Sequence, residues 1–123
     1  MEYNVKMKWK VLLDEDFIPW LEKQEVGLQD EVLAYANVLE IYGPQLGRPR
    51  VDTLAGTSVN IKELRVQYKG DPWRILFAFD TQRRAILLVG GNKRGSKRWY
   101  KVHIPIAEER LRRHLKNMEK QNG

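Results

Sequence analysis

Alternating apolar and polar residues mark the start of the chain. Val5, Met7, Trp9, Val11 and Leu13 are separated by lysines at positions 6, 8 and 10. A period of two predicts a β-strand with one buried and one solvated face. Lysines along the solvated face are typical of a strand at the edge of a sheet.

Two helices are predicted next. The acidic run Asp14-Glu15-Asp16 offers N-cap residues for a helix ending near Gln24, and Pro19 falls in its first turn, where the missing N–H costs little. Gly27 is predicted to break the chain. Apolar residues then recur at helical spacing up to Gly43-Pro44, which predicts a second helix and an αα-hairpin. These apolar residues are Leu28, Val32, Tyr35, Ala36, Leu39 and Tyr42.

The middle of the chain predicts a long loop followed by three strands. Turn-forming residues dominate positions 44–61, and long loops in compact domains are often functional. Strands are predicted at Lys62–Lys69, Pro72–Phe79 and Arg84–Val89. The last two are apolar on both faces, which indicates central strands of an antiparallel meander.

A final helix is predicted with Pro105 in its first turn. His114 is expected on its solvated face, whereas four other residues form an apolar stripe. The stripe consists of Ala107, Leu111, Leu115 and Met118. The resulting order, β-α-α-β-β-β-α, predicts an α+β fold with helices packed on a mostly antiparallel sheet.

Composition limits the chemistry. The length of 123 residues fits one domain over 1–123, and 42% hydrophobic and 31% charged residues are ordinary for a folded protein. The absence of cysteine excludes disulfides, thiolate metal sites and a cysteine nucleophile. With only two histidines we expect no metal and no cofactor. No apolar run approaches the ~20 residues of a membrane span, so we expect a cytoplasmic protein with no membrane partner.

Charge is divided unevenly along the chain. Residues 1–61 contain six Lys and Arg against ten Asp and Glu, net −4, whereas residues 62–123 contain sixteen against six, net +10. A surface polarised in this way favours a phosphate-rich partner, because basic side chains release counterions when they neutralise phosphates. The alternative is a soluble protein with charged helices.

Two arginines interrupt the apolar pattern of neighbouring predicted strands. Arg65 and Arg74 each alternate out of phase with the apolar residues around them. Guanidinium groups match phosphate oxygens and stay charged at any relevant pH, so such a pair can bracket a phosphodiester. Alternatively each pairs with a carboxylate such as Glu63 or Asp80, or points to solvent.

The turn between these strands decides whether the arginines meet. If its two central residues are Gly70-Asp71, Tyr68 pairs with Trp73 and the arginines share one sheet face as diagonal neighbours, roughly 7–8 Å apart. A loop of odd length would instead place them on opposite faces. We expect the shared face.

Residues 92–103 combine five basic residues with three rings and no acidic residue. That mixture favours single-stranded nucleic acid, whose backbone attracts cations and whose bases stack on flat rings. A protein interface is the alternative, and for Trp99 we favour a role in the core. The candidate RNA-contacting residues are Lys62, Lys97, Arg98, Trp99, Lys101 and His103.

These side chains are sufficient to cleave RNA without a metal. The 2′-hydroxyl of RNA can attack the adjacent phosphate, so an enzyme has to remove that proton, stabilise charge and protonate the leaving oxygen. Tyr100 or His103 can transfer protons, and the basic residues can stabilise charge. The candidate catalytic residues are Arg65, Arg74, Lys93, Arg94 and Tyr100. Phosphate-binding glycine loops, paired-histidine metal spacing and serine-nucleophile motifs are absent from the sequence.

An ordered set of motifs over roughly residues 5–118 resembles the phage Gp49-like/HigB branch of the RelE/ParE toxin superfamily. The set consists of Leu46-Gly47-Arg48-Pro49, Leu54, Lys62-Glu63-Leu64-Arg65, Gly70, Trp73-Arg74-Ile75-Leu76-Phe77-Ala78-Phe79-Asp80, Ile86-Leu87-Leu88, Gly90-Gly91-Asn92-Lys93, Trp99-Tyr100 and Ile104-Pro105-Ile106-Ala107-Glu108.

The resemblance implies a RelE-like, microbial-ribonuclease-type fold and ribosome-dependent cleavage of messenger RNA, which inhibits translation. It also implies neutralisation by a HigA-like helix-turn-helix antitoxin. By motif, Arg65 matches the arginine that ends the family's "ELR" strand, and Arg74 matches the aromatic-arginine dipeptide. Lys93 and Arg94 match the basic pair after the glycine turn, and Tyr100 falls near the tyrosine before the last helix.

The sequence departs from RelE where the general base is expected. Before Arg65, where RelE supplies lysines, this chain offers only Lys62, so the base is left open. Two other functions also fit the basic half: a ParE-like inhibitor of DNA gyrase without nuclease activity, and a non-catalytic RNA- or ribosome-binding module. Arg65, Arg74 and Tyr100 together favour the nuclease.

Overall fold

The computed structural model describes residues 8–57 and 60–122, so the predicted strand residues Val5 and Met7 lie outside the described part. The predicted order is confirmed, with one short strand added inside the stretch 44–61, which was wrongly expected to be all loop. The elements are β1 (Lys10–Leu13), α1 (Phe17–Glu22), α2 (Val26–Tyr42), a 3₁₀ turn η1 (Gly43–Gln45), β2 (Val51–Thr53), β3 (Lys62–Tyr68), β4 (Asp71–Phe79), β5 (Arg84–Asn92) and α3 (Trp99–Asn122).

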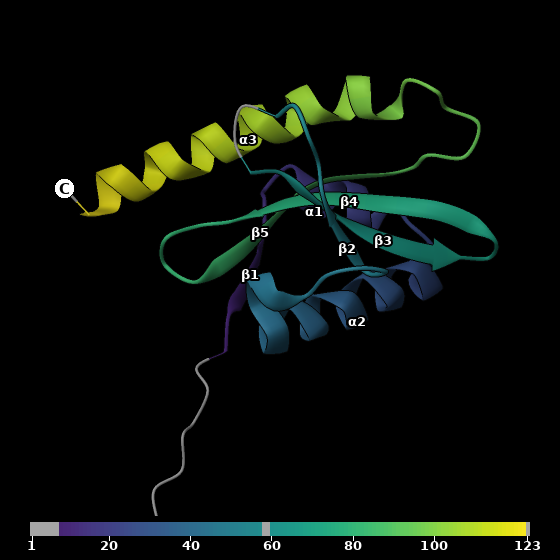
Figure 1. Cartoon of the computed structure of the whole chain (residues 1–123), viewed down its shortest axis with the longest axis horizontal. Helices are drawn as coiled ribbons and strands as arrows, with labels where there is room; N and C mark the ends of the chain where they lie inside the picture. Colours follow the sequence, from purple (N-terminus) through teal and green to yellow (C-terminus); the bar gives the residue numbers. More distant parts are fainter. Residues whose placement is uncertain (1–7, 58–59, 123) are drawn as a thin grey trace, which may run out of the picture.

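The fold has three layers, a five-stranded sheet with helices on both of its faces (Figure 1). The strand order is β1-β5-β4-β3-β2; β1 is parallel to β5 and the other pairs are antiparallel. Helices α1 and α2 cover one face, around Phe17, Val32 and Phe77, and α3 covers the other, around Leu76 and Leu111. The α+β class, the edge position of β1 and the central position of β4 are therefore confirmed.

The β3–β4 turn lies one residue earlier than predicted. Lys69 and Gly70 both have positive φ (50° and 79°), the conformation of a two-residue turn that follows the right-handed twist of a hairpin. Tyr68 therefore pairs with Asp71, and Arg65 lies directly opposite Arg74 instead of diagonally. Because this register differs from the expected one by two residues, both arginines still share one face, as predicted.

Two predicted boundaries at glycines are wrong for the same reason. Gly27 lies inside the first turn of α2, where a Cβ would come within 2.3 Å of the Tyr68 hydroxyl. Gly90 and Gly91 belong to β5, where a Cβ would come within 2.7 Å of Trp20 and 2.6 Å of Trp99. These glycines allow a ring to approach the backbone closely; they do not end an element.

Helix α3 begins at Trp99, two turns before the predicted start, so Pro105 lies inside it. Trp99 is buried against the sheet, which anchors these first turns, and Val102 N–H donates to the Arg98 carbonyl at 3.0 Å. The predicted positions of two side chains on α3 were also wrong. Leu115 is exposed, whereas His114 is half-buried and bonds to Asp80. In the described part of the chain, no helix combines the length and apolar character that crossing a membrane requires.

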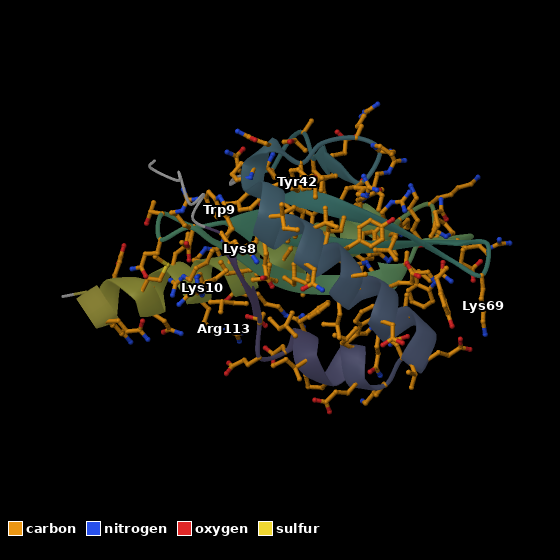
Figure 2. All side chains as sticks on the ribbon, turned by 90° about the horizontal axis from the view of Figure 1, so that it is seen from below. Lys8, Trp9, Lys10, Tyr42, Lys69 and Arg113 are labelled. Carbon is orange, nitrogen blue, oxygen red and sulfur yellow. The ribbon has the colours of Figure 1, made fainter. Side chains whose placement is uncertain are left out.

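The end of α2 is joined to β1 by aromatic packing. Trp9 lies beside Gly43 and contacts Phe79 edge-on, with ring centroids 5.0 Å apart. Figure 2 shows Trp9 and Tyr42 near one end of α2 and Lys69 at the opposite end of the molecule, at the tip of the β3–β4 hairpin. Helix α2 ends at Gly43, as the sequence predicted, and Gly43 adopts a φ of 55°.

Buried carboxylates tie α3 to the rest of the molecule. Arg113 donates to both oxygens of Asp14 at 2.9 and 3.0 Å. The fully buried Asp80 accepts a hydrogen bond from Arg84 Nε at 2.7 Å, and its Oδ2 lies 3.0 Å from His114 Nε2. Burial alone raises the pKa of Asp80, but the hydrogen bonds from His114 and Arg84 outweigh it and lower the pKa below its usual value.

We expect Asp80→Asn to lower the free energy of unfolding at neutral pH by about 3 kcal/mol, because Arg84 and His114 lose a buried anionic partner. The contribution of Asp80 is present above about pH 4, the ordinary pKa, and is lost as the pH falls through the lower folded pKa. Urea unfolding at several pH values measures this. Glu109→Gln, which removes an exposed partner of Arg112, is the control with little effect. An unchanged unfolding midpoint for Asp80→Asn at neutral pH would contradict the assignment.

Candidate active site

One carboxylate lies at the centre of the predicted arginine face. Glu63 and Arg65 are two residues apart on β3 and so lie on the same face of the sheet. Arg74 lies opposite Arg65 on β4, and Tyr100 extends toward this face from the first turn of α3. The Tyr100 hydroxyl donates to Glu63 Oε2 at 2.6 Å. Arg74 Nε lies 3.8 Å from the same oxygen, and Arg65 Nε lies 3.9 Å from Oε1. These four residues form what we call the Glu63 cluster.

The two arginines differ in access to solvent. The side chain of Arg74 is 4% exposed and that of Glu63 is 6%, whereas that of Arg65 is 36% exposed. Arg74 Nη1 donates to the Trp73 carbonyl, and its buried Nε has no hydrogen-bond partner. Both arginines nevertheless form an ion pair with the Glu63 carboxylate, which is the alternative considered from the sequence. Arg74 is placed to hold Glu63, whereas Arg65 can reach a ligand.

Tyr100 is held in its protonated form. Burial first, and then the hydrogen bond to Glu63, raise the pKa of Tyr100 to about 12. Lys93 Nζ lies 3.4 Å from the Tyr100 hydroxyl and 5.2 Å from the ring centroid. A phenol with this pKa can donate or relay a proton at neutral pH, but it is not a free phenolate base.

The other predicted basic residues are more dispersed. Arg94 forms an ion pair with Asp71 and donates to the Gly70 carbonyl at 2.8 Å, so it lies at the β3–β4 turn and not in the Glu63 cluster. Lys62 Nζ donates to Thr53 Oγ1 at 2.9 Å. Three others, Lys97, Arg98 and Lys101, are exposed at the start of α3 and the loop before it.

Trp99 does not belong with the RNA-contacting residues. It is 3% exposed and packs among the core residues between α3 and the sheet, which confirms the favoured core role. The His103 ring stacks on the Trp99 ring, with a centroid distance of 4.1 Å and an interplanar angle of 12°. Stacking of an RNA base on Trp99 itself is therefore excluded in this conformation.

Glu63 is the site residue that the sequence prediction missed. It was weighed only as a partner for an arginine, although it lies two residues before Arg65 and so on the same face. Its contact with Tyr100 spans 37 residues and had no local signal. Within the described residues, no three His, Asp or Glu side chains lie close enough to hold a metal ion.

Residues 19–112 match the family described as "Phage derived protein Gp49-like (DUF891)". This match covers more than half of the chain. The chain belongs to the Gp49-like family.

Two Mycobacterium tuberculosis relatives of this Gp49-like chain are named as toxins. HigB3 is 46% identical over 99 residues, covering 76% of this chain and 85% of that protein. HigB2 is 44% identical over 103 residues, covering 81% of this chain but 51% of that protein, so the chain spans about half the length of HigB2. These relatives place the chain among the HigB-type toxins of toxin–antitoxin systems.

Solved structures show the same fold at low sequence identity. The RelE–RelB complex of Pyrococcus horikoshii contains a chain with a TM-score of 0.55 and 20% identity, covering 73% of this chain and all of that one. A free mutant form of Escherichia coli RelE has a TM-score of 0.55 and 12% identity, covering 87% and 98%. The Gp49-like chain therefore has the RelE fold, as the sequence resemblance implied.

The raised pKa of Tyr100 gives a direct test of the cluster. In an alkaline ultraviolet titration, the difference between the wild-type protein and Tyr100→Phe should show ionisation near pH 12. Glu63→Gln should move this midpoint toward, but not down to, the ordinary value of about 10, because burial still opposes the phenolate. The free energy contributed by this phenol is complete below pH 10 and is lost as the pH rises toward 12. A Tyr100 midpoint near 10 in the wild-type protein would show that the hydroxyl is not enclosed with Glu63.

Proposed function

We propose that this HigB-type toxin is an endoribonuclease that cuts messenger RNA in the ribosomal A site. The observation that carries the proposal is the Glu63 carboxylate held between two arginines and the Tyr100 hydroxyl on one sheet face. The sequence resemblance to ribosome-dependent RelE-like toxins supports the choice of target. We expect the protein to act in the cytoplasm, where ribosomes are.

The proposed reaction uses the RNA's own 2′-hydroxyl as nucleophile. This hydroxyl loses its proton as its oxygen attacks the adjacent phosphorus, and the bond from phosphorus to the 5′-oxygen breaks. The departing oxygen takes up a proton. The products are a 2′,3′-cyclic phosphate and a 5′-hydroxyl, so the reaction needs a proton acceptor, a proton donor and positive charge near the phosphate.

We assign the role of proton acceptor to Glu63. The Tyr100 hydroxyl already donates to Glu63. Tyr100 can therefore take the proton of the 2′-hydroxyl while it passes its own proton to the Glu63 carboxylate, which is the final acceptor. Arg65, the more exposed arginine, is the candidate for the phosphate oxygens. Arg74 acts as a positioning residue for Glu63, and Lys93 beside Tyr100 is the candidate proton donor to the 5′-oxygen.

Exposed basic residues near the start of α3 extend this site. Lys97, Arg98 and Lys101 are exposed, and we propose that they contact the RNA backbone. Lys62 on β3 and His103 on α3 are also proposed to contact the RNA. Arg94 is proposed to contribute positive charge from its position at the β3–β4 turn. The antitoxin partner is proposed to be HigA-like and to cover this basic face with acidic or apolar residues.

Substitutions in the Glu63 cluster should slow cleavage strongly. We expect Glu63→Gln, Arg65→Ala and Tyr100→Phe each to slow cleavage by roughly 100-fold or more, the usual contribution of acid–base and charge stabilisation. The measurement is the mapping of 5′ ends on a defined message bound to purified ribosomes. Arg112→Ala, an exposed arginine elsewhere on α3, is the matched control with unchanged cleavage.

The same variants separate the rival functions in cells. Loss of toxicity together with loss of new 5′ ends in translated frames supports the nuclease. If Glu63→Gln and Arg65→Ala fold and stay fully toxic, leave messages intact and induce DNA damage, the nuclease proposal is wrong and gyrase inhibition is favoured.

A further inference from the structure

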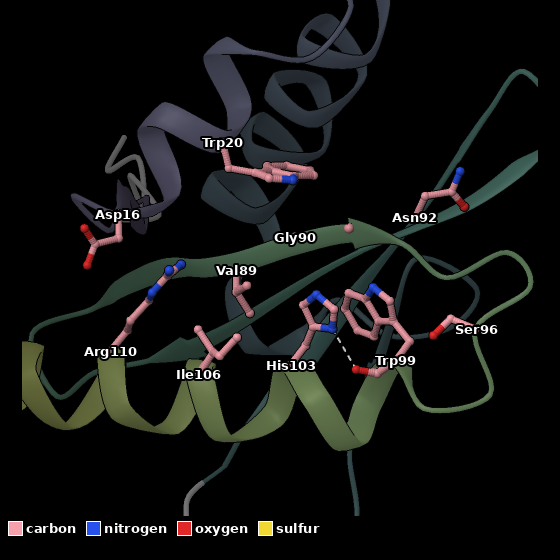
Figure 3. Close-up of a pocket in the computed structure, with 11 residues that line it drawn as sticks. Asp16, Trp20, Val89, Gly90, Asn92, Ser96, Trp99, His103, Ile106 and Arg110 are labelled. Atoms are coloured by element: carbon pink, nitrogen blue, oxygen red, sulfur yellow. Dashed lines mark hydrogen bonds between the residues drawn. The ribbon is translucent and has the colours of Figure 1, made fainter.

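A second site lies on the other side of Trp99 from the Glu63 cluster. A pocket of about 370 Å³ opens between α1 and α3 along the last residues of β5 (Figure 3). Its lining includes Trp20, Gly90, Ser96, His103 and Arg110. This volume is within the range of small-ligand sites.

The floor of this pocket is an uncovered strand edge. β1 ends at Leu13, opposite Leu87, while β5 continues to Asn92. Arg110 Nη1 donates a hydrogen bond to the Leu88 carbonyl at 2.7 Å. Beyond that point no described strand lies beside β5 on this side, so backbone groups face the pocket.

The pairing pattern identifies Gly90 as the residue that faces outward. Lys93 N–H donates to the Pro72 carbonyl of β4. In an antiparallel pair, alternate residues direct their N–H and C=O groups toward the same neighbour, so Gly91 faces β4 and Gly90 faces away. Gly90 therefore presents one donor and one adjacent acceptor to the pocket.

Aromatic side chains stand on both sides of this edge. In Figure 3, Trp20 lies on one side of β5, and His103 and Trp99 rise from α3 on the other. His103 Nδ1 donates to the Trp99 carbonyl at 2.7 Å, because a carbonyl can only accept. The other ring nitrogen, Nε2, points toward β5 and the pocket.

We propose that this pocket binds one base of the RNA, next to the scissile phosphate. A base lying in the plane of the sheet would pair its donor–acceptor edge with the N–H and C=O of Gly90. Its faces would contact Trp20 and the ring of His103, which is how proteins hold unstacked bases. The inference rests on the proposed nuclease function and adds a base-reading site to it.

The position of the pocket agrees with this role. Gly91 lies directly opposite Arg74 in the sheet, one strand spacing away, or about 4.8 Å. The loop after β5 reaches both sites, since Lys93 contacts Tyr100 and Ser96 lines the pocket. A strand of RNA whose phosphate contacts Arg65 can therefore extend toward Gly90.

A base fits this edge better than an added peptide strand does. A peptide strand needs several free backbone groups in a row and room for side chains on both faces. Here Asp14 N–H and Arg110 already donate to the carbonyls of Leu87 and Leu88, and aromatic side chains occupy both faces of β5 beside Gly90. The free Gly90 backbone groups and the space between the aromatic side chains suit a single flat ring.

The test is a titration of the isotope-labelled full chain with each of the four ribonucleoside monophosphates, followed by NMR. We expect the Gly90 amide and the Trp20 and Trp99 indole signals to shift with at least one nucleotide and not with ribose 5-phosphate, which lacks a base. His103→Ala should weaken this binding at least 5-fold, whereas His103→Phe, which keeps a flat ring, should retain most of it. Arg112→Ala is the control with unchanged affinity.

Several outcomes would overturn the base pocket. These are shifts confined to basic residues, equal shifts with ribose 5-phosphate, or unaltered nucleotide affinity in a folded His103→Ala variant. Shifts at Gly90 that only an antitoxin peptide produces would assign the edge to strand addition instead. Because nucleotide binding is measured without ribosomes, it remains interpretable if cleavage fails, and cleavage with an unoccupied pocket would refute only the base site.

Discussion

A buried arginine in the middle of the sheet organises this molecule. Arg74 lies on the central strand with almost no exposed side-chain area, and a buried cation without an anionic partner costs several kcal/mol. Glu63 on the neighbouring strand supplies that partner, and the remaining capacity of its carboxylate is met by Arg65 and Tyr100. The contacts that make Arg74 tolerable thus also fix the start of α3 over the sheet and create the candidate active site.

Local patterns in the sequence were sufficient to assign faces but not contacts. Alternation placed Arg65 and Arg74 on one face, and this held although the register was wrong by two residues. The error came from the turn, because Lys69 adopts a positive φ that its residue type does not favour. A direct pairing of the two arginines could not be distinguished from a diagonal one without that backbone conformation.

The start of α3 shows a different reason for failure. Pro105 is usually a signal for a first turn, but burial of Trp99 outweighs the lost hydrogen bond and extends the helix toward the sheet. The helical spacing of Trp99, His103 and Ile106 carried this information, but the Pro105 signal placed the start of the predicted helix later. The contact between Tyr100 and Glu63 consequently could not be predicted, and Glu63 was not considered as a proton acceptor.

In the proposed reaction Tyr100 takes the proton of the 2′-hydroxyl and passes its own proton to Glu63, which the two arginines hold in place. The most direct measurement is the rate of single-turnover cleavage on programmed ribosomes by the wild-type protein and by Glu63→Gln. We expect the glutamine variant, which keeps the shape of the side chain but cannot take up the proton, to cleave at least 100-fold more slowly. A folded glutamine variant that cleaves at the wild-type rate would contradict this role of Glu63.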